Sequence, residues 1–268
     1  MAEDLLFSLR DSLIVVTGAM GRLGRHYLAA LADRGAQIAA IDTAAAIARA
    51  EVLPANTKGY AADVTVKAEL DAALVAIARD FGRAPDGLVN NAALDSPPGS
   101  PSSENGPFET YPEESWDRVM QVNVKGVFLC SQVFGRAMSF EGKGSIVNVG
   151  SIYGKVSPDQ DIYEFRRARG EIFFKPVAYS ASKSAIYNLT RYLAVYWSKK
   201  GVRVNTLTLA GVYDGQEKAF LDAYCPRVPL ARMASPSDYI GPLVFLLSDA
   251  SSYMTGSDLV VDGGWTAK

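Results

Sequence analysis

The chain contains 268 residues, of which 49% are hydrophobic and 21% are charged. These values are typical of a globular protein, and the length suits one large α/β domain better than two. A net charge of −2, with no run of Lys or Arg, argues against a nucleic-acid partner. Uncharged stretches such as Ala44–Ala48 are too short to span a bilayer, and Met1–Asp4 carries acid where a signal peptide carries base. We therefore expect a cytoplasmic protein without a membrane partner.

The cysteines and the histidine exclude several kinds of site. Cys130 and Cys225 lie far apart without a C-x-x-C spacing, which predicts buried free thiols rather than a disulfide. His26 is the only histidine, so a His-rich metal site is excluded and no metal is expected. A Ser-His-Asp hydrolase would depend on this one residue, for which a solvated or packing role on the first helix is the better interpretation.

Strand-like and helix-like segments alternate along the chain. The predicted strands are Leu13–Thr17, Gln37–Ile41, a short third strand closed by Asp63, Gly87–Asn90, Ser145–Val149, Arg203–Leu209 and Asp258–Val261. The predicted helices are Leu23–Asp33, Lys67–Phe81, Glu113–Met138, Tyr179–Lys199 and Pro236–Ser248. Continuous apolar strands that alternate with helices predict an α/β fold with a doubly wound parallel sheet. No repeat or linker divides residues 1–268, so a single domain is expected.

Two segments interrupt this alternation. Ser96–Pro107 is rich in Pro, Ser and Gly, which predicts an irregular surface loop. Lys155–Val177 is longer and mixes charged with aromatic residues. A loop of that length in a compact domain is usually either functional or mobile.

A glycine-rich turn follows the first strand in the pattern T-G-x-x-G-x-x-G and leads directly into a helix. Gly18 permits the tight turn, Gly21 lets the backbone approach a pyrophosphate, and Gly24 lets helix and strand pack closely. The phosphates would lie at the helix N-terminus, where free N–H groups favour negative charge. Glycines alone can mark a structural turn, but their place between strand and helix favours dinucleotide binding.

Acidic residues after the second and third strands suggest contacts to the adenosine end of that dinucleotide. Asp42 ends the second strand, where an acid can accept hydrogen bonds from the ribose and repel a 2′-phosphate, so NAD is favoured over NADP. Alternatively Asp42 caps the Ala-rich helix that follows, and Arg22 is placed to reach a 2′-phosphate. The ribose interpretation of Asp42 carries more weight. Asp63 would meet the adenine or cap the next helix.

Tyr179 and Lys183 stand at positions i and i+4, and hence on one face of a helix. An ammonium beside a phenol favours phenolate, so we expect Lys183 to lower the pKa of Tyr179 from its usual value of about 10. Tyr179 is then a usable acid/base, and Ser151, just after a strand, is placed to hydrogen-bond the same substrate oxygen.

With these motifs the sequence resembles the short-chain dehydrogenase/reductase family nearly from end to end. The resemblance extends to Asn90-Asn91-Ala92-Ala93 and Val122-Asn123-Val124, and to the closing segments Tyr253–Gly256 and Val261–Trp265. It implies a Rossmann fold and a catalytic tetrad of Asn123, Ser151, Tyr179 and Lys183. Lys183 would also hold the nicotinamide ribose, and Asn123 would support a proton relay. The predicted cofactor contacts are Gly18, Met20, Gly21, Arg22, Leu23, Asp42, Asp63, Val64, Asn91, Ala92, Ala93, Tyr179, Lys183 and Val212.

Departures from the family pattern concern the substrate side. The glycine spacing is that of the longer members that modify nucleotide sugars, and Ser151 and Tyr179 are 28 positions apart, about twice the usual interval. Lys155–Val177 is therefore a substrate-loop insertion. Such departures resemble a subgroup linked to bacterial surface sugars, including nonulosonic acids and flagellin glycans. The insertion's cations, Arg166, Arg167, Arg169 and Lys175, would clamp a phosphate or carboxylate, or simply form a solvated face.

The sequence thus predicts an NAD(P)-dependent oxidoreductase acting on a secondary alcohol or ketone of a sugar or sugar acid. Two alternatives are a reductase of 3-oxoacyl or other small ketones, which the charged insertion argues against, and a non-catalytic dinucleotide-binding regulator, which typically lacks Tyr or Lys of the active pair. The resemblance also implies a homo-oligomer, a tetramer or dimer, formed through the long helices. The aromatics Tyr187, Tyr192, Tyr196 and Trp197 suit such a face or the core.

Overall fold

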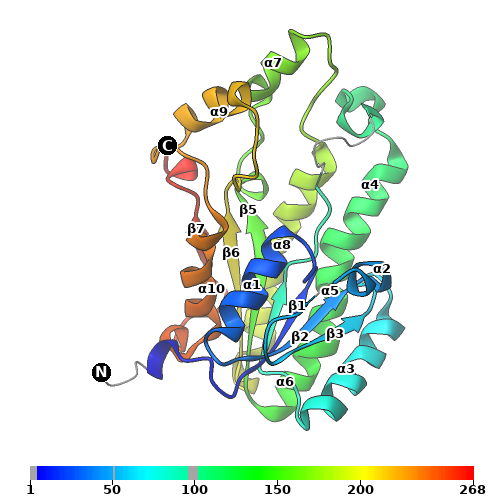
Figure 1. The fold of residues 1–268 in the computed structure, drawn as a ribbon, viewed down its shortest axis with the longest axis vertical. Coiled ribbons are helices and arrows are strands. Elements are labelled where there is room, and N and C mark those ends of the chain that lie inside the picture. The colour runs from blue at the N-terminus through cyan, green and yellow to red at the C-terminus, as the bar shows by residue number, and fades with distance from the viewer. Residues whose placement is uncertain (1–4, 51, 96–101) are drawn as a thin grey trace.

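The computed structural model describes residues 5–50, 52–95 and 102–268. Within them, one sheet has the order β3-β2-β1-β4-β5-β6-β7, and every neighbouring pair is parallel (Figure 1). The strands are β1 (Leu13–Thr17), β2 (Gln37–Asp42), β3 (Thr57–Ala61), β4 (Gly87–Asn90), β5 (Gly144–Ser151), β6 (Val202–Leu209) and β7 (Asp258–Val261). The predicted doubly wound parallel sheet is confirmed, although the third strand ends two residues before Asp63.

Helices cover both faces of the sheet because its central strands are buried on both sides. The helices are α1 (Arg22–Ala32), α2 (Ala44–Ala48), α3 (Lys67–Phe81), α4 (Glu113–Met120), α5 (Val127–Cys130), α6 (Arg136–Glu141), α7 (Glu164–Arg167), α8 (Val177–Trp197), α9 (Lys218–Tyr224) and α10 (Ile240–Leu247). Helices α1 and α10 pack on one face, and α3, α5 and α8 pack on the other. Among these described helices, none is long and apolar enough to cross a membrane.

The predicted helix Glu113–Met138 is interrupted by two π-helical turns, Gln121–Gly126 and Ser131–Gly135, which join α4, α5 and α6. Wide turns of this kind often occur at functional sites. Asn123 lies within the first of them and is buried.

The insertion between β5 and α8 is not the long irregular loop that its composition suggests. It contains a 3-10 turn, Gln160–Tyr163, followed by α7. Its apolar residues join α9 and the segment after it in a third hydrophobic cluster, separate from those on the two sheet faces. The buried members are Ile162, Tyr163, Phe173, Tyr224, Val228 and Met233. In Figure 1, α7 and α9 lie beyond the carboxyl ends of β5 and β6. We call this layer, residues 155–175 and 212–233, the cap.

The solvent exposure of His26 and of the two cysteines tests further predictions from the sequence. His26 is exposed, as its solvated interpretation requires, and both cysteines are free, but only Cys130 is buried, whereas Cys225 is partly exposed. In the predicted loop Ser96–Pro107, residues 96–101 lie outside the described part, and Ser102–Asn105 forms a 3-10 turn. The acidic N-terminal residues 1–4 also lie outside it.

Candidate active site

A cleft of about 1090 Å³ opens at the carboxyl ends of the strands. The sheet order reverses between β1 and β4, and in open parallel sheets ligands bind beside such a reversal. Each residue that the sequence nominates for cofactor contact lines this cleft. The volume lies at the upper end of the range for a single ligand, which leaves room for a second molecule beside a dinucleotide.

The glycine turn has the close backbone packing that its sequence predicts. Gly18 has a positive φ of 61°, and a Cβ there would lie 2.7 Å from Cα of Ala92. A Cβ on Gly24 would lie 2.3 Å from the carbonyl oxygen of Gly18. The side chain of Asn91 donates to the carbonyls of Thr17 and Gly18, both at 3.0 Å. The turn is therefore held against the end of β4, with the N-terminus of α1 facing the cleft.

Asp42 binds the glycine turn and does not cap the following helix. Its Oδ2 accepts from the Met20 N–H at 2.8 Å, and its Oδ1 accepts from the Thr43 N–H at 2.8 Å. The N-cap of α2 is Thr43, whose hydroxyl accepts from the Ala46 N–H. The capping interpretation of Asp42 is therefore wrong. The carboxylate borders the cleft beside the turn, as a ribose ligand must.

Asp63 organises a turn beside the cleft. Its Oδ1 accepts from both the N–H and the hydroxyl of Thr65 at 2.8 Å, while the N-cap of α3 is Val66. Its suggested role as the helix cap is therefore wrong. The neighbouring Val64 is buried and lines the cleft, so both residues are available to an adenine ring.

Arg22 faces Asp214 across the mouth of the cleft. The guanidinium Nη2 lies 2.6 Å from Oδ2 of Asp214, and both side chains are about half exposed. The sequence placed Arg22 within reach of a 2′-phosphate. In the structure the two charges neutralise each other, because the loop after β6 returns over the N-terminus of α1.

Three members of the predicted catalytic tetrad meet in the cleft. Ser151 ends β5, while Tyr179 and Lys183 lie one turn apart on α8, and all three line the cavity. Lys183 is buried and its Nζ donates to the carbonyl oxygen of Val149 at 2.8 Å. The same Nζ lies 5.8 Å from the ring centroid of Tyr179. The helical spacing therefore places phenol and ammonium side by side, as predicted.

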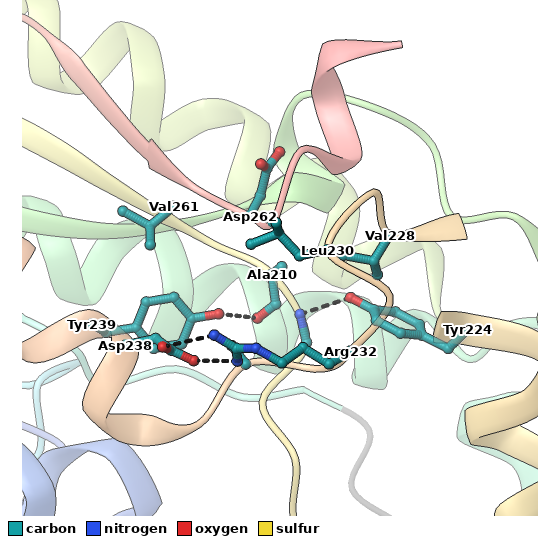
Figure 2. A pocket seen from close by; sticks show the side chains of 12 residues that line it. Ala210, Tyr224, Val228, Leu230, Arg232, Asp238, Tyr239, Val261 and Asp262 are labelled. Carbon is teal, nitrogen blue, oxygen red and sulfur yellow. Dashed lines mark hydrogen bonds and ion pairs between the residues drawn. The ribbon is translucent and has the colours of Figure 1, made fainter. Parts of the chain in front are cut away.

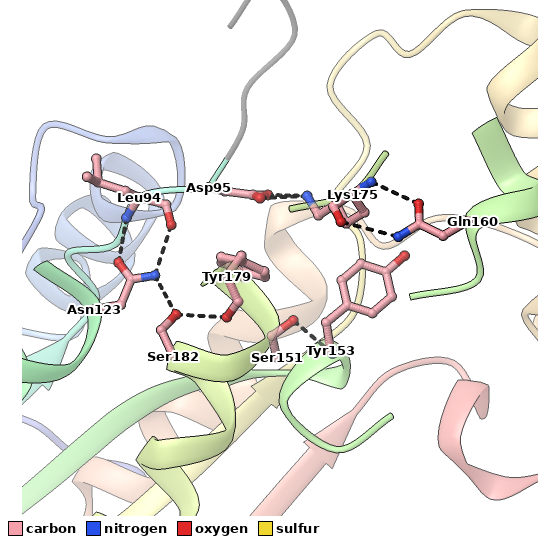
Figure 3. Close-up of polar contacts among 9 residues, drawn as sticks. All are labelled: Leu94, Asp95, Asn123, Ser151, Tyr153, Gln160, Lys175, Tyr179 and Ser182. Carbon is pink, nitrogen blue, oxygen red and sulfur yellow. Dashed lines mark hydrogen bonds and ion pairs between the residues drawn. The ribbon is translucent and has the colours of Figure 1, made fainter. Parts of the chain in front are cut away.

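Asn123 is connected to Tyr179 through the helix backbone (Figure 3). Its amide accepts from the Leu94 N–H at 2.7 Å and donates to the Leu94 carbonyl at 2.9 Å and to Ser182 Oγ at 3.0 Å. Ser182 in turn donates to the carbonyl oxygen of Tyr179 at 2.7 Å. Asn123 thus fixes the start of α8 against the segment after β4. Its part in a proton relay stays a prediction.

The expected lowering of the Tyr179 pKa is wrong for the free chain. Burial raises the pKa of Tyr179 well above its usual value, and Asp95 raises it further, whereas hydrogen bonding to Ser151 acts in the opposite direction. Burial also lowers the pKa of Lys183 to about 8, partly opposed by Asp95. Spacing alone revealed the neighbouring ammonium but not the loss of solvent, which disfavours both charged forms.

The four cations of the insertion have different roles. Arg167 donates to the carbonyls of Gln160 and Phe173 and holds the cap together, and Arg169 pairs with Glu217 at its exposed edge. Arg166 lines the cleft but pairs with Glu171 at 2.7 Å. Lys175 lies deepest, with a side chain that is only 10% exposed. A joint clamp of four cations is therefore wrong.

Lys175 forms an ion pair that sequence reasoning missed. Its Nζ lies 2.6 Å and 2.8 Å from the two carboxylate oxygens of Asp95, which follows β4 by five residues (Figure 3). The same Nζ lies 5.1 Å from the ring centroid of Tyr179. An acid two residues after the Asn90-Asn91-Ala92-Ala93 motif was the available signal. Aromatic side chains also line the cleft without having been predicted as site residues: Tyr153, Tyr163, Phe165, Phe173, Phe220 and Tyr224.

A second cavity of about 140 Å³ lies beside the cleft, below the loop that follows β6 (Figure 2). Tyr224 accepts from the Gly211 N–H at 2.9 Å, and Tyr239 donates to the Ala210 carbonyl at 3.1 Å. Arg232 and Asp238 close one side with an ion pair. These contacts anchor the backbone that carries Val212 into the main cleft. Among the described residues, no cluster of three His, Cys, Asp or Glu is placed to hold a metal.

Comparison with known proteins identifies relatives over the whole length. The family model described as "Enoyl-(Acyl carrier protein) reductase" matches residues 18–266. The chain is 34% identical to D-threitol dehydrogenase of Mycolicibacterium smegmatis, covering 100% of this chain and 98% of the relative. It is 33% identical to galactitol 2-dehydrogenase of Rhizobium johnstonii, covering 99% of each.

Solved structures give the same result. A short chain dehydrogenase from Leptospira borgpetersenii with bound NAD+ superposes with a TM-score of 0.86 at 30% identity, covering 99% of this chain and 97% of the other. A gluconate 5-dehydrogenase from Burkholderia cenocepacia, in complex with NADP and tartrate, has a TM-score of 0.83 at 26% identity and covers 98% of each chain.

Proposed function

Because this chain belongs to the short-chain dehydrogenase/reductase family of NAD(P)-dependent oxidoreductases, we propose that it interconverts a secondary alcohol and a ketone on a polyol, sugar or sugar acid. One observation carries the proposal. Tyr179 and Ser151 lie in a cleft that also holds the glycine turn, while a charged and aromatic cap covers its other end. The retained Tyr179–Lys183 pair argues against a regulator, which needs neither side chain.

The residues around the glycine turn fit a nicotinamide dinucleotide. The turn leaves no space for side chains at Gly18 and Gly24, and it leads directly into the N-terminus of α1, where a pyrophosphate would bind. Asp42, Asp63 and Val64 lie where the adenosine end would bind, and Lys183 and Val212 lie toward the nicotinamide end. When bound, the cofactor supplies or accepts the hydride.

The chain's own residues handle the proton. Tyr179 removes the hydroxyl proton of an alcohol, or donates a proton to a ketone oxygen in the reverse direction. Ser151 hydrogen-bonds the same oxygen. Lys183 holds positive charge beside the phenol and is placed to bind the ribose, and Asn123 keeps the start of α8 in position. Tyr179 is the partly accessible member, whereas Ser151, Lys183 and Asn123 are buried.

The cofactor we propose is NAD. The Asp42 carboxylate would repel a 2′-phosphate, and Arg22, the cation at the start of α1, is paired with Asp214. Relatives of known structure bind either cofactor: the Leptospira protein holds NAD+ and the Burkholderia protein holds NADP. The preference of this chain therefore rests on Asp42.

Polyols and sugars are the substrates that the relatives and the cap support together. The relatives include dehydrogenases of threitol, galactitol and gluconate. The narrower link to nonulosonic acids and flagellin glycans has no counterpart among these relatives and stays a prediction. A 3-oxoacyl substrate is the alternative, and the family description names an acyl group, but the charged side chains Lys175, Asp95 and Arg166 that line the cleft do not suit a long apolar chain.

We also propose a single catalytic domain that spans residues 1–268, with 155–177 as its substrate-binding insertion, in a cytoplasmic homo-oligomer. Tyr192 and Tyr196 are exposed on α8 with their rings stacked at 6.1 Å, and a second copy would cover them. Tyr187 and Trp197 are buried, so the expectation that they belong to that face is wrong; they pack in the interior.

The test is turnover of a panel of polyols, sugars, aldonates and nonulosonic acids with NAD or NADP, followed by absorbance of the reduced nicotinamide. We expect wild type to oxidise at least one polyol, sugar or sugar acid with NAD. The Tyr179→Phe variant should lose about 1000-fold or more in kcat, because it removes the acid/base, while its NAD affinity stays within about threefold. NAD binding without turnover of any panel member would contradict the proposal and favour a regulator.

A further inference from the structure

The pairing of charges in the cleft limits the kind of substrate that fits it. The described side chains that line the cleft include four cations: Arg22, Arg166, Lys175 and Lys183. Three of them pair with carboxylates at 2.6 to 2.7 Å, and Lys183 donates to a backbone carbonyl at 2.8 Å. An anionic substrate group would have to compete with these partners.

The Asp95–Lys175 pair is the one beside the reacting groups. Lys175 Nζ lies 5.1 Å from the ring centroid of Tyr179 and 5.9 Å from that of Tyr153, and Asp95 also lines the cleft. Burial opposes the charge on Lys175, but Asp95 and Tyr163 more than offset it and raise the pKa of Lys175 above its usual value. Lys175 is therefore charged at neutral pH, with its ammonium against the Asp95 carboxyl group.

The insertion holds Lys175 in a fixed position. The side-chain oxygen of Gln160 accepts from the Lys175 N–H at 2.9 Å, and its amide nitrogen donates to the Lys175 carbonyl at 3.2 Å. Arg167 donates to the Gln160 carbonyl at 3.0 Å, and Pro176, directly after Lys175, is the N-cap of α8. One amide side chain thus satisfies both backbone groups of Lys175, so its ammonium is preorganised above Tyr179.

From this arrangement we infer that the cleft selects neutral polyhydroxylated substrates, and that Asp95 and Lys175 together bind a hydroxyl group next to the carbon that reacts at Tyr179. A hydroxyl both donates and accepts, so it matches a carboxylate and an ammonium held side by side. A carboxylate or phosphate at the same place would be repelled by Asp95. This inference rests on the proposed function and narrows it to polyols and neutral sugars rather than sugar acids.

The test compares polyols with the aldonates made by oxidising one end, such as glucitol with gluconate and galactitol with galactonate. These partners share a carbon chain and differ in charge. Wild type should show a kcat/KM at least about tenfold higher for the polyol of a pair. An equal or higher value for the aldonate overturns the inference.

Asp95→Asn tests the role of the pair directly, because it removes the negative charge and leaves Lys175 unmatched. We expect kcat/KM for the polyol to fall by about tenfold to a hundredfold and that for the aldonate to rise, which reverses the preference. Lys175→Met should lower kcat/KM for the polyol without raising kcat/KM for the aldonate. The matched control is Asp222→Asn, which breaks an exposed Lys218–Asp222 pair on α9 outside the cleft and should leave both values unchanged.

Calorimetric titration of the wild-type NAD complex with each polyol and aldonate tests the neutral-ligand site separately from the proposed reaction. Polyol binding that exceeds aldonate binding, in a protein that turns over neither, supports the neutral-ligand site and contradicts the proposed reaction. If the enzyme is active but Asp95→Asn leaves the polyol-to-aldonate ratio of kcat/KM unchanged, the hydroxyl-binding role of the pair is contradicted while the proposed reaction stands. Thermal melting confirms that each variant is folded before its kinetics are used.

Discussion

The two halves of the cleft are built in different ways. The cofactor half uses backbone: Gly18 and Gly24 bring the turn, the end of β4 and α1 within contact, and Asp42 is tied to that turn. The substrate half uses side chains from distant segments, such as Asp95 and Lys175, which are 80 positions apart. Backbone recognition suits a cofactor shared by many enzymes, whereas side chains on an insertion suit a substrate particular to one of them.

The largest effect on NAD binding should come from Gly24→Ala in the cofactor half. A Cβ at this position would meet the Gly18 carbonyl oxygen at 2.3 Å, so the turn must shift. We expect the NAD dissociation constant to rise by about 100-fold and the free energy of unfolding to fall by about 1–3 kcal/mol. The control is Gly241→Ala, where a Cβ meets nothing within 4 Å. Unchanged NAD affinity in Gly24→Ala would show that the turn does not hold the cofactor.

Asp42→Ala should separate the two cofactors. Without the carboxylate, NAD loses a ribose acceptor and NADP is no longer repelled. We expect NAD affinity to fall about tenfold while NADP affinity stays the same or rises. Both dissociation constants can be measured by quenching of intrinsic fluorescence. The ratio of the two dissociation constants is the decisive quantity, because the substitution also removes the hydrogen bond from Met20 to Asp42 and so weakens the binding of both cofactors. An unchanged ratio would contradict the assignment to NAD.

Gln160→Leu should affect the substrate half alone. Lys175 loses both backbone partners, so its ammonium is no longer fixed above Tyr179. We expect KM for a polyol to rise several-fold, up to about tenfold, with kcat within about twofold and NAD affinity unchanged. Steady-state kinetics at saturating NAD make this distinction. A fall in kcat with constant KM would show instead that Gln160 supports the chemistry.

Lys183→Met should stabilise the free protein in a pH-dependent way. Burial lowers the pKa of Lys183 from 10.5 to about 8. The folded state therefore binds a proton at Lys183 less tightly than the unfolded chain does, and the protonated side chain destabilises the fold. This loss in the free energy of unfolding is complete below pH 8 and disappears as the pH rises to 10.5. At pH 7 the variant should gain about 2–3 kcal/mol, or roughly 5 °C in Tm. Melting curves from pH 7 to 10.5 should converge, and a constant difference would exclude this origin.

The sequence predicts the cofactor half well because its signals are local. The glycine spacing, the strand before it and the acid after the second strand all depend on neighbours in the chain, and the structure brings them together as expected. Tyr179 and Lys183 follow the same rule, since helical spacing places them on one face.

The contacts of the substrate half could not be predicted from the sequence, because they join residues that are far apart along the chain. Helices α7 and α9 are short, so their own propensity is not enough to form them. The third hydrophobic cluster stabilises α9 and the turn before α7, while hydrogen bonds from Arg167 to the carbonyls of Gln160 and Phe173 hold α7. The composition of the insertion shows charged and aromatic residues without their partners. The pKa of Tyr179 was misjudged for the same reason, because burial is a property of the whole fold.

The third hydrophobic cluster has a consequence for motion. Its buried members, including Tyr163, Phe173 and Tyr224, pack with one another and are separate from the clusters on the two sheet faces. A small cluster of this kind opens at a lower free-energy cost than the strands below it. The cap can therefore loosen to release product while the sheet, the glycine turn and the tetrad keep their positions. In hydrogen exchange, amides of α7 and α9 would then exchange together, and well before those of β5 and β6.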